Sequence, residues 1–179
     1  MAVKNPKNKG NGFERTVAKI LSEWAGVKFM RTPSSGAIHN FNDKRVVSDI
    51  VAPLSLGNFP FSIECKNVEC SWEWSTFLEG TSVTINKHWD QCVTDAEREG
   101  LIPLLIVTKN FRSIFGIVEE PTWVGLPYKA TKEISTMILD KVWKEPLIIF
   151  KLESLLQRVT IQDVLSLVPV NYPTSQSMG

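Results

Sequence analysis

The chain has 179 residues, of which 43% are hydrophobic and 22% are charged, and its formal net charge is only +1. These values suit one domain with a hydrophobic core, and the lack of an apolar run near 18 residues excludes a membrane-spanning helix. The three cysteines lack the spacing of a zinc site or a disulfide framework. Because the N-terminus is polar and not an apolar leader, the sequence predicts a soluble cytoplasmic protein with free thiols.

The charge is distributed unevenly along the chain. Residues 1–50 contain nine lysines and arginines against four acidic residues, whereas the remainder is acidic. We expect residues 1–12 to be a basic flexible tail, and the N-terminal third to carry a face that attracts nucleic acid. For the lysines of the tail, simple solvation explains the charge equally well. The basic residues of this third include Lys4, Lys7, Lys9, Arg15, Arg31, Lys44 and Arg45.

The first predicted elements are a helix, a strand and a loop. Apolar residues at helical spacing predict a helix over Phe13–Ala25, which Gly26 ends. Glu14 lies in its first turn, where the helix dipole alone would also favour an acidic residue. A strand follows over Val27–Arg31, and then a polar loop over Thr32–Asn42.

Two strand-like segments come next and predict a hairpin. Val46–Ala52 is rich in β-branched residues, Phe59–Asn67 is a second strand, and the turn between them centres on Leu56-Gly57. With that centre, Asp49 on the first strand lies opposite Glu64 on the second. The hairpin therefore predicts two carboxylates side by side.

The second strand of the hairpin adds an amine to this pair. Side chains alternate along a strand, so Lys66 shares the face of Glu64. The intervening Phe61, Ile63 and Cys65 are expected to turn toward a core. Because facing carboxylates repel each other, the arrangement indicates a hard cation such as Mg²⁺ between them.

Residues 67–108 are predicted to contain an aromatic segment, a helix and a strand. The aromatic segment, Trp72–Leu78, is expected to pack on the sheet or on a partner subunit, and less readily to stack on bases. Asn86–Gly100 predicts a helix that buries Trp89 and Cys92, with Lys87 and Gln91 away from that apolar stripe. Leu101–Thr108 is apolar throughout, which is typical of a central strand.

The rest of the chain predicts further strands and helices in one domain. The predicted elements are strands at Ser113–Val118 and Leu147–Lys151, a helix at Thr131–Trp143, a short helix capped by Thr160 and a tail at 169–179. Together the elements predict an α/β domain over residues 13–168, in which helices flank both faces of a mixed sheet.

Around the hairpin the chain resembles the PD-(D/E)XK nuclease superfamily, whose site combines an Asp on one strand with Glu-x-Lys on the next. The matching residues are Ser48-Asp49 and Glu64-Cys65-Lys66, with Ser48 in place of the proline of that pattern. Two upstream stretches, Gly12–Arg15 and Arg31–Gly36, resemble the Holliday-junction resolvases of archaea and phages. The resemblance spans about Gly10–Val107 and implies a restriction-endonuclease-like fold.

The resemblance also implies roles for individual residues. Asp49, Glu64, the Cys65 carbonyl and Glu14 would bind Mg²⁺, for which Mn²⁺ can substitute. Lys66 would position or deprotonate the attacking water, and Ser35 would bond the scissile phosphate. The residues implied or expected to contact DNA are Arg15, Arg31, Ser34, Ser35, Lys44, Arg45, Lys87 and Gln91. Gln91 fits this role poorly, because it lies opposite the apolar stripe of its helix.

The expected function is thus Mg²⁺-dependent hydrolysis of phosphodiester bonds in branched DNA, with four-way junctions cut by a homodimer. The dimer follows from symmetry, since paired cuts need two sites related by a two-fold axis. The aromatic segment and the C-terminal apolar runs are the candidate interface. Two alternatives remain open at this stage: a restriction or repair nuclease that acts on linear duplex, and a DNA-binding protein without catalysis.

Overall fold

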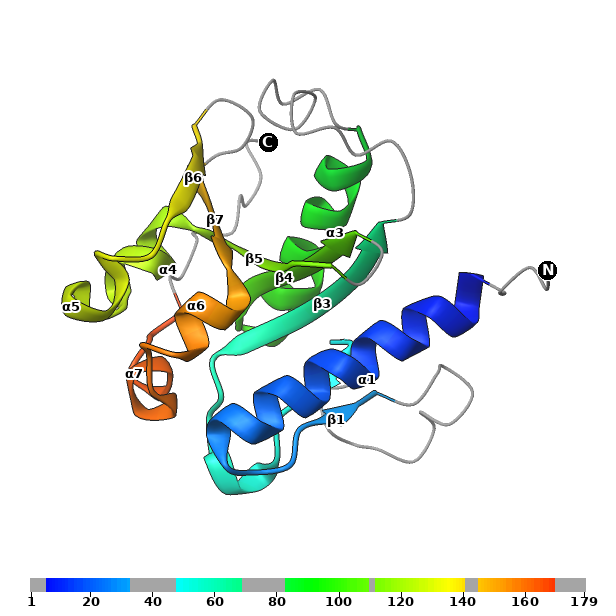
Figure 1. Cartoon of the computed structure of the whole chain (residues 1–179), viewed down its shortest axis with the longest axis horizontal. Coiled ribbons are helices and arrows are strands. Elements are labelled where there is room, and N and C mark those ends of the chain that lie inside the picture. Colours follow the sequence, from blue (N-terminus) through cyan, green and yellow to red (C-terminus); the bar gives the residue numbers. More distant parts are fainter. Residues whose placement is uncertain (1–5, 33–47, 69–82, 110–111, 141–144, 170–179) are drawn as a thin grey trace, which may run out of the picture.

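The structure is a computed structural model, and it describes residues 6–32, 48–68, 83–109, 112–140 and 145–169. These residues form a seven-stranded sheet with helices on both faces (Figure 1). The strands are β1 (Met30–Arg31), β2 (Ile50–Val51), β3 (Phe61–Val68), β4 (Ile102–Lys109), β5 (Ile114–Glu119), β6 (Thr136–Leu139) and β7 (Leu147–Lys151). The helices are α1 (Pro6–Ala25), the 3-10 turn η3 (Leu54–Leu56), α3 (Val83–Glu99), α4 (Glu120–Gly125), α5 (Tyr128–Thr131), α6 (Leu152–Leu156) and α7 (Ile161–Leu165).

The sheet has the order β1-β2-β3-β4-β5-β7-β6. Strands β3 and β4 run parallel, and the other neighbouring strands pair antiparallel. A parallel pair needs a crossover, which α3 provides between β3 and β4. This mixed sheet with flanking helices confirms the predicted α/β class and fits a restriction-endonuclease-like fold.

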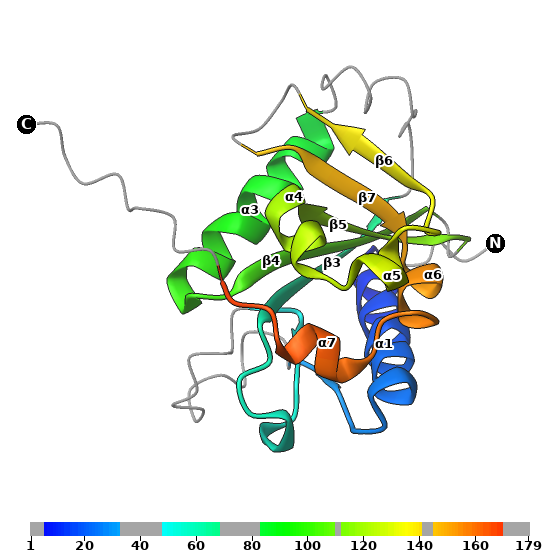
Figure 2. The same ribbon diagram turned by 90° about the vertical axis from the view of Figure 1, so that its left-hand side faces the viewer.

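Helices α1 and α3 cover opposite faces of the sheet (Figure 2). The buried stripe of α1, which includes Phe13 and Val17, shares one core cluster with Ile63 and Cys65 of β3. On the other face, Trp89 of α3 belongs to a second cluster built around β4, β5 and β7. Strand β4 is therefore covered on both faces, as its continuous apolar sequence predicted.

The hairpin of β2 and β3 has the predicted register. Ile50 pairs with Ile63, which is the alignment that puts Asp49 level with Glu64. The turn between the strands contains η3, and Gly57 follows it with a φ of 63°, a value that glycine adopts without strain. The paired part of β2 is shorter than the predicted Val46–Ala52, of which residues 46 and 47 lie outside the described residues.

Two helix predictions need correction. Helix α1 begins at Pro6 and not at Phe13, so residues 6–12 of the expected flexible tail are helical. The prediction started at the first apolar residue, but proline at the first helical position also favours a helix start, and polar residues can continue the helix. The predicted strand Val27–Arg31 shortens to Met30–Arg31 beside this helix.

The predicted helix at Thr131–Trp143 is wrong in its described part. Helix α5 ends at Thr131, and Thr136–Leu139 forms the edge strand β6 on β7. The spacing of the apolar residues suited a helix, but the β-branched Thr136 and Ile138 suit an edge strand whose backbone bonds to β7. The sequence reading also missed the short helices α4 and α6.

Smaller predictions agree with the structure. Gly100 follows α3 with a φ of 66°, in the left-handed region that commonly ends helices. Thr160 caps α7 through a reciprocal capping box with Asp163. Cys65 and Cys92 are free and buried, whereas Cys70 and the aromatic segment lie outside the described residues. Within the described ranges, no helix combines the length and the apolar character needed to cross a bilayer.

Candidate active site

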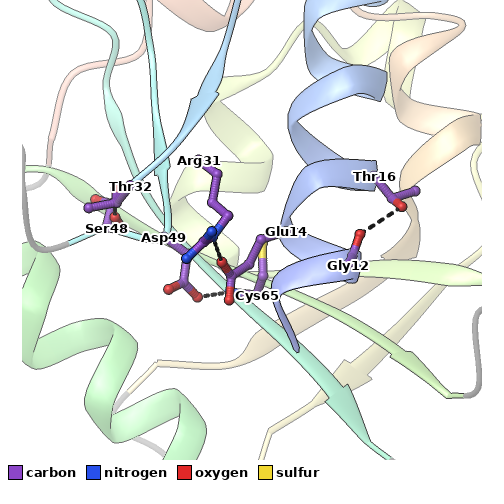
Figure 3. Close-up of polar contacts among 8 residues, drawn as sticks. All are labelled: Gly12, Glu14, Thr16, Arg31, Thr32, Ser48, Asp49 and Cys65. Carbon is purple, nitrogen blue, oxygen red and sulfur yellow. Dashed lines mark hydrogen bonds and ion pairs between the residues drawn. The ribbon is translucent and has the colours of Figure 1, made fainter. Parts of the chain in front are cut away.

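The candidate site begins where β2 separates from β3. The Asp49 N–H donates to the Ile63 carbonyl (2.9 Å), but the chain bends at Ser48 and Asp49 and leaves the ladder. The next donor on β3, the Cys65 N–H, bonds to Oδ2 of Asp49 at 2.8 Å (Figure 3). The Asp49 carboxylate thus replaces the backbone acceptor that a continuing strand would have supplied, which fixes its position against β3.

The bend that carries Asp49 is held by three hydroxyl-bearing residues. Ser48 and Ser62 are both buried, and their hydroxyl oxygens are 2.8 Å apart. The Thr32 hydroxyl donates to the Ser48 carbonyl, and the Thr32 N–H donates to the Asp49 carbonyl at 2.9 Å. Ser48, which stands where the superfamily pattern has proline, is therefore part of the hydrogen-bond network that fixes Asp49.

Glu64 lies beside Asp49 and is almost fully buried, with 5% of its surface exposed. Burial, and next the negative charge of Glu64, raise the pKa of the Asp49 carboxyl from 3.8 to about 6. The Cys65 N–H and the charge of Lys66 act in the opposite direction. The structure therefore brings together the two carboxyl groups that the hairpin register predicted, in an environment that penalises their joint ionisation.

Lys66 is bonded to the second of these acids. Its Nζ lies 2.5 Å from Oε1 of Glu64, and a quarter of the Lys66 side chain is exposed. Burial lowers the pKa of the Lys66 ammonium, but the hydrogen bond and the charge of Glu64 outweigh burial, so the pKa is raised overall. One ammonium thus faces two carboxylates, which leaves an excess of negative charge when both acids are ionised.

Glu14 and Arg31 form an ion pair on the α1 side of β3. The Arg31 Nε donates to Oε2 of Glu14, and both side chains are largely buried (Figure 3). Within the described part of the chain, no three His, Cys, Asp or Glu side chains form a group that could hold a metal ion. Asp49 and Glu64 are two carboxyl groups in contact with each other, whereas Glu14 is engaged by Arg31.

This donor set fits a magnesium ion. Mg²⁺ in proteins is usually held by one or two carboxylates and several waters, and it does not need a complete cage of protein ligands. Asp49 and Glu64 supply hard oxygen donors, and burial, followed by the negative charge of Glu64, raises the pKa of the Asp49 carboxyl, so a cation beside both groups would favour their ionised forms. The Cys65 carbonyl, between the two residues of Glu-x-Lys, is the third predicted oxygen.

The other predicted site residues divide into two groups. Arg15 on α1 and Lys87 and Gln91 on α3 are exposed to solvent, and Gln91 lies off the buried stripe of its helix, as expected. Ser34, Ser35, Lys44 and Arg45 lie outside the described residues. The predicted phosphate-binding loop is therefore not among the described parts of the site.

Sequence reasoning missed His88 of α3 and the hydroxyl network behind Asp49. His88 is half-buried, and burial, followed by the positive charge of Lys66, lowers the pKa of its imidazole. Its position four residues before the buried Cys92 was a usable signal, because such residues share one face of a helix. The pairing of Ser48 with Ser62 had no comparable signal in the sequence.

The mixed sheet, with Asp49 just before β2 and Glu64-Cys65-Lys66 on the neighbouring β3, has the pattern of a PD-(D/E)XK nuclease. In agreement with this class, a family model described as "Phage putative PDDEXK endonuclease" matches residues 5–166. The match spans most of the chain, and the protein belongs to this family. Comparisons with curated proteins and with solved structures gave no match.

Proposed function

We propose that this nuclease is a divalent-metal-dependent endonuclease that hydrolyses phosphodiester bonds in branched DNA, with Mg²⁺ as its ion. The observation that carries the proposal is the contact of the partly buried Asp49 carboxyl with the buried Glu64 carboxyl, beside a lysine ammonium. A structural role explains this cluster poorly, because apposed buried acids destabilise a folded protein unless a cation compensates them. Family membership supports the nuclease chemistry.

In this proposal, Asp49 and Glu64 bind the ion together with the Cys65 carbonyl. A bound Mg²⁺ supplies Lewis-acid activation of the phosphate and of a water nucleophile. The Cys65 N–H orients the Asp49 carboxylate through its 2.8 Å bond. Lys66, released from Glu64, would position the attacking water through its ammonium, or would accept a proton from that water after losing its own proton to solvent. Glu14 would join the ligands only after its pair with Arg31 opens.

We further propose that DNA approaches from the basic N-terminal third of the chain. Arg15 is exposed on α1, the helix that packs against the site strand, and can contact phosphates. Lys87 and Gln91 extend the proposed contact surface to α3. Ser34, Ser35, Lys44 and Arg45 would complete it, with Ser35 bonded to an oxygen of the scissile phosphate.

A cleavage assay that compares DNA shapes tests this proposal. Four-way junction, flap, linear duplex and single strand, each end-labelled and of matched length, are incubated with Mg²⁺ and the full chain. We expect the junction to be cut fastest and no cleavage when EDTA replaces Mg²⁺. Faster cleavage of linear duplex would contradict the branched-DNA substrate but not the nuclease assignment. Cleavage undiminished in EDTA would contradict the metal mechanism.

Junction resolution also implies a homodimer. Light scattering at micromolar concentration should then give about twice the 20.2 kDa of one chain. A plasmid-borne cruciform should be linearised by paired nicks within one binding event. A monomer that nicks junctions no faster than duplex would contradict the resolvase assignment.

A further inference from the structure

His88 of α3 lies at the edge of the face by which that helix packs on the sheet. The buried residues Ile85, Trp89 and Cys92 define this face, and the half-buried His88 borders it, three residues after Ile85 and four before Cys92. Burial and the charge of Glu64 raise the pKa of the Cys92 thiol, whereas the backbones of Leu104 and Glu64 lower it, so this turn of α3 lies against β3 and β4. His88 is one turn of helix away from that contact.

The geometry of the crossover then places His88 over Lys66. Because α3 connects two parallel strands, it runs antiparallel to β3. Moving four residues back from Cys92 to His88 covers about 6 Å along the helix. Moving two residues forward from Glu64 to Lys66 covers about 6.6 Å along the strand, in the same direction. The two steps match, which puts the imidazole beside the lysine side chain.

The electrostatics of His88 agree with this placement. Burial, and next the positive charge of Lys66, lower the pKa of the imidazole from 6.5. A histidine of this kind is uncharged at neutral pH, and one of its ring nitrogens then offers a lone pair to a donor. His88 is thus a hydrogen-bond acceptor next to an ammonium group.

Lys66 needs such an acceptor once Glu64 is used for another purpose. In the present structure the ammonium is bonded to Glu64 Oε1 at 2.5 Å. If Glu64 binds a divalent ion, the ion and the ammonium repel each other at the same carboxylate. A partly buried ammonium without a hydrogen-bond partner is costly, so Lys66 would move to a neutral acceptor within reach.

We propose that His88 is a positioning residue of the active site, which accepts a hydrogen bond from the Lys66 ammonium when Glu64 turns to the metal ion. This inference rests on the proposed metal-dependent function. His88 does not touch the reacting atoms. It stabilises the arrangement in which Glu64 is free for the ion and Lys66 remains close to the attacking water.

Calorimetric titration of the full chain with Mg²⁺ in the absence of DNA tests the role of His88. His88→Leu preserves most of the side-chain volume but has no hydrogen-bond acceptor. His88→Ala removes both the volume and the acceptor. We expect both variants to bind Mg²⁺ about tenfold more weakly, the scale of one hydrogen bond to a charged group. His88→Gln, whose amide oxygen can accept, should stay within about threefold of the wild type.

The Lys66→Ala background distinguishes positioning from a general structural effect. If His88 acts through Lys66, His88→Leu should not weaken Mg²⁺ binding further in that background. Asp90→Asn, an exposed change on the same helix, serves as the matched control and should leave Mg²⁺ affinity unchanged. Circular dichroism verifies that each variant is folded. If His88→Leu does not fold, the Mg²⁺ affinities of His88→Ala and His88→Gln are compared instead.

Two outcomes would overturn the inference: wild-type Mg²⁺ affinity in folded His88→Leu or His88→Ala, or an equal loss with and without Lys66. Failure of the proposed function is recognised separately, through Asp49→Asn and Glu64→Gln. If these two variants lose Mg²⁺ binding while the His88 variants do not, the metal site stands and the role of His88 is wrong. If they bind Mg²⁺ normally, the metal site itself is wrong.

Discussion

Two ion pairs lie on opposite faces of β3, and each is formed by one acidic and one basic side chain. Glu14 with Arg31 on the α1 side, and Glu64 with Lys66 on the α3 side, are both shielded from solvent. The Glu64–Lys66 pair also has the Asp49 carboxyl against it, which burial and Glu64 hold at a raised pKa. A buried carboxylate with its own guanidinium can serve as structure, whereas two apposed carboxyl groups beside one ammonium favour an additional cation.

The largest expected effect is the loss of cleavage when a carboxyl group on the Glu64–Lys66 side of β3 is removed. Asp49→Asn and Glu64→Gln should each lower the cleavage rate by at least ~10³-fold, because a metal ligand supplies several kcal/mol of transition-state stabilisation. DNA binding should be retained or strengthened, since a negative charge near phosphate is removed. Single-turnover cleavage and fluorescence anisotropy measure the two quantities.

Glu14→Gln is the matched variant on the other side of the strand. We expect a loss of about tenfold or less, because one hydrogen bond to the Arg31 guanidinium is weakened and the two carboxylates remain. A loss of rate as large as that of Glu64→Gln would contradict the different roles assigned to the two ion pairs. It would show that Glu14 leaves Arg31 and acts as a metal ligand.

Lys66→Ala should lower the rate by at least ~10²-fold, the usual scale for a positioned acid-base group. The variant should still bind Mg²⁺ and bind it more tightly, because no ammonium then competes for Glu64 Oε1. Calorimetry and single-turnover cleavage together test this prediction. If Lys66 merely neutralised Glu64, the rate would be retained while metal affinity changed.

The raised pKa of Asp49 predicts a pH dependence of stability in the metal-free protein. Folding raises this pKa from 3.8 to about 6, so the folded state holds the proton more tightly than the unfolded state. The resulting stabilisation of the folded state is complete at a pH below the pKa of Asp49 in the unfolded state. It is lost as the pH rises through the pKa of Asp49 in the folded state. The loss amounts to about 3 kcal/mol at most, from 1.36 kcal/mol per pKa unit.

Urea unfolding in EDTA at pH 4 and pH 7 measures this loss. Asp49→Asn has no carboxyl to titrate, so its free energy of unfolding should fall less over the interval than that of the wild type. Saturating Mg²⁺ at pH 7 should stabilise the wild type and not Asp49→Asn. Identical pH dependence in the two proteins would mean that Asp49 is not buried against Glu64.

The smallest effect serves as a control remote from both ion pairs. Thr160→Ala removes the capping box of α7, which costs about 1 kcal/mol of stability. Mg²⁺ affinity and cleavage rate should be unchanged, because α7 shares no contact with Asp49 or Glu64 among the described hydrogen bonds. If Thr160→Ala lost as much Mg²⁺ affinity as the variants at Asp49 and Glu64, the metal site would respond to any loss of stability.

Much of the hairpin and its site could be predicted from the sequence. The turn chemistry around Gly57 fixed the register, and the register placed Asp49 level with Glu64. Strand alternation then placed Cys65 in the core on the α1 side. These predictions succeeded because the contacts concerned are close in sequence, and turn geometry and side-chain period are local properties.

Predictions that depended on distant partners were less complete. The helical spacing around Ile138 was overridden by the pairing of β6 with β7, which local periodicity cannot anticipate. The burial of Glu64 follows from the cover that α3 provides, a contact between elements joined by a long crossover. The pairing of Glu14 with Arg31 likewise depends on how α1 packs against the sheet.

Residue types and strand period were enough to identify which residues could form the site: an Asp and a Glu-x-Lys in a hairpin whose turn dictates the register. The contacts and burial of each group depend on the tertiary structure. It bonded Asp49 to the Cys65 N–H where β2 leaves the ladder, paired Lys66 with Glu64, and engaged Glu14 with Arg31. The physical reason is that residue type and strand period are encoded locally, whereas burial and charge pairing depend on which elements pack against one another.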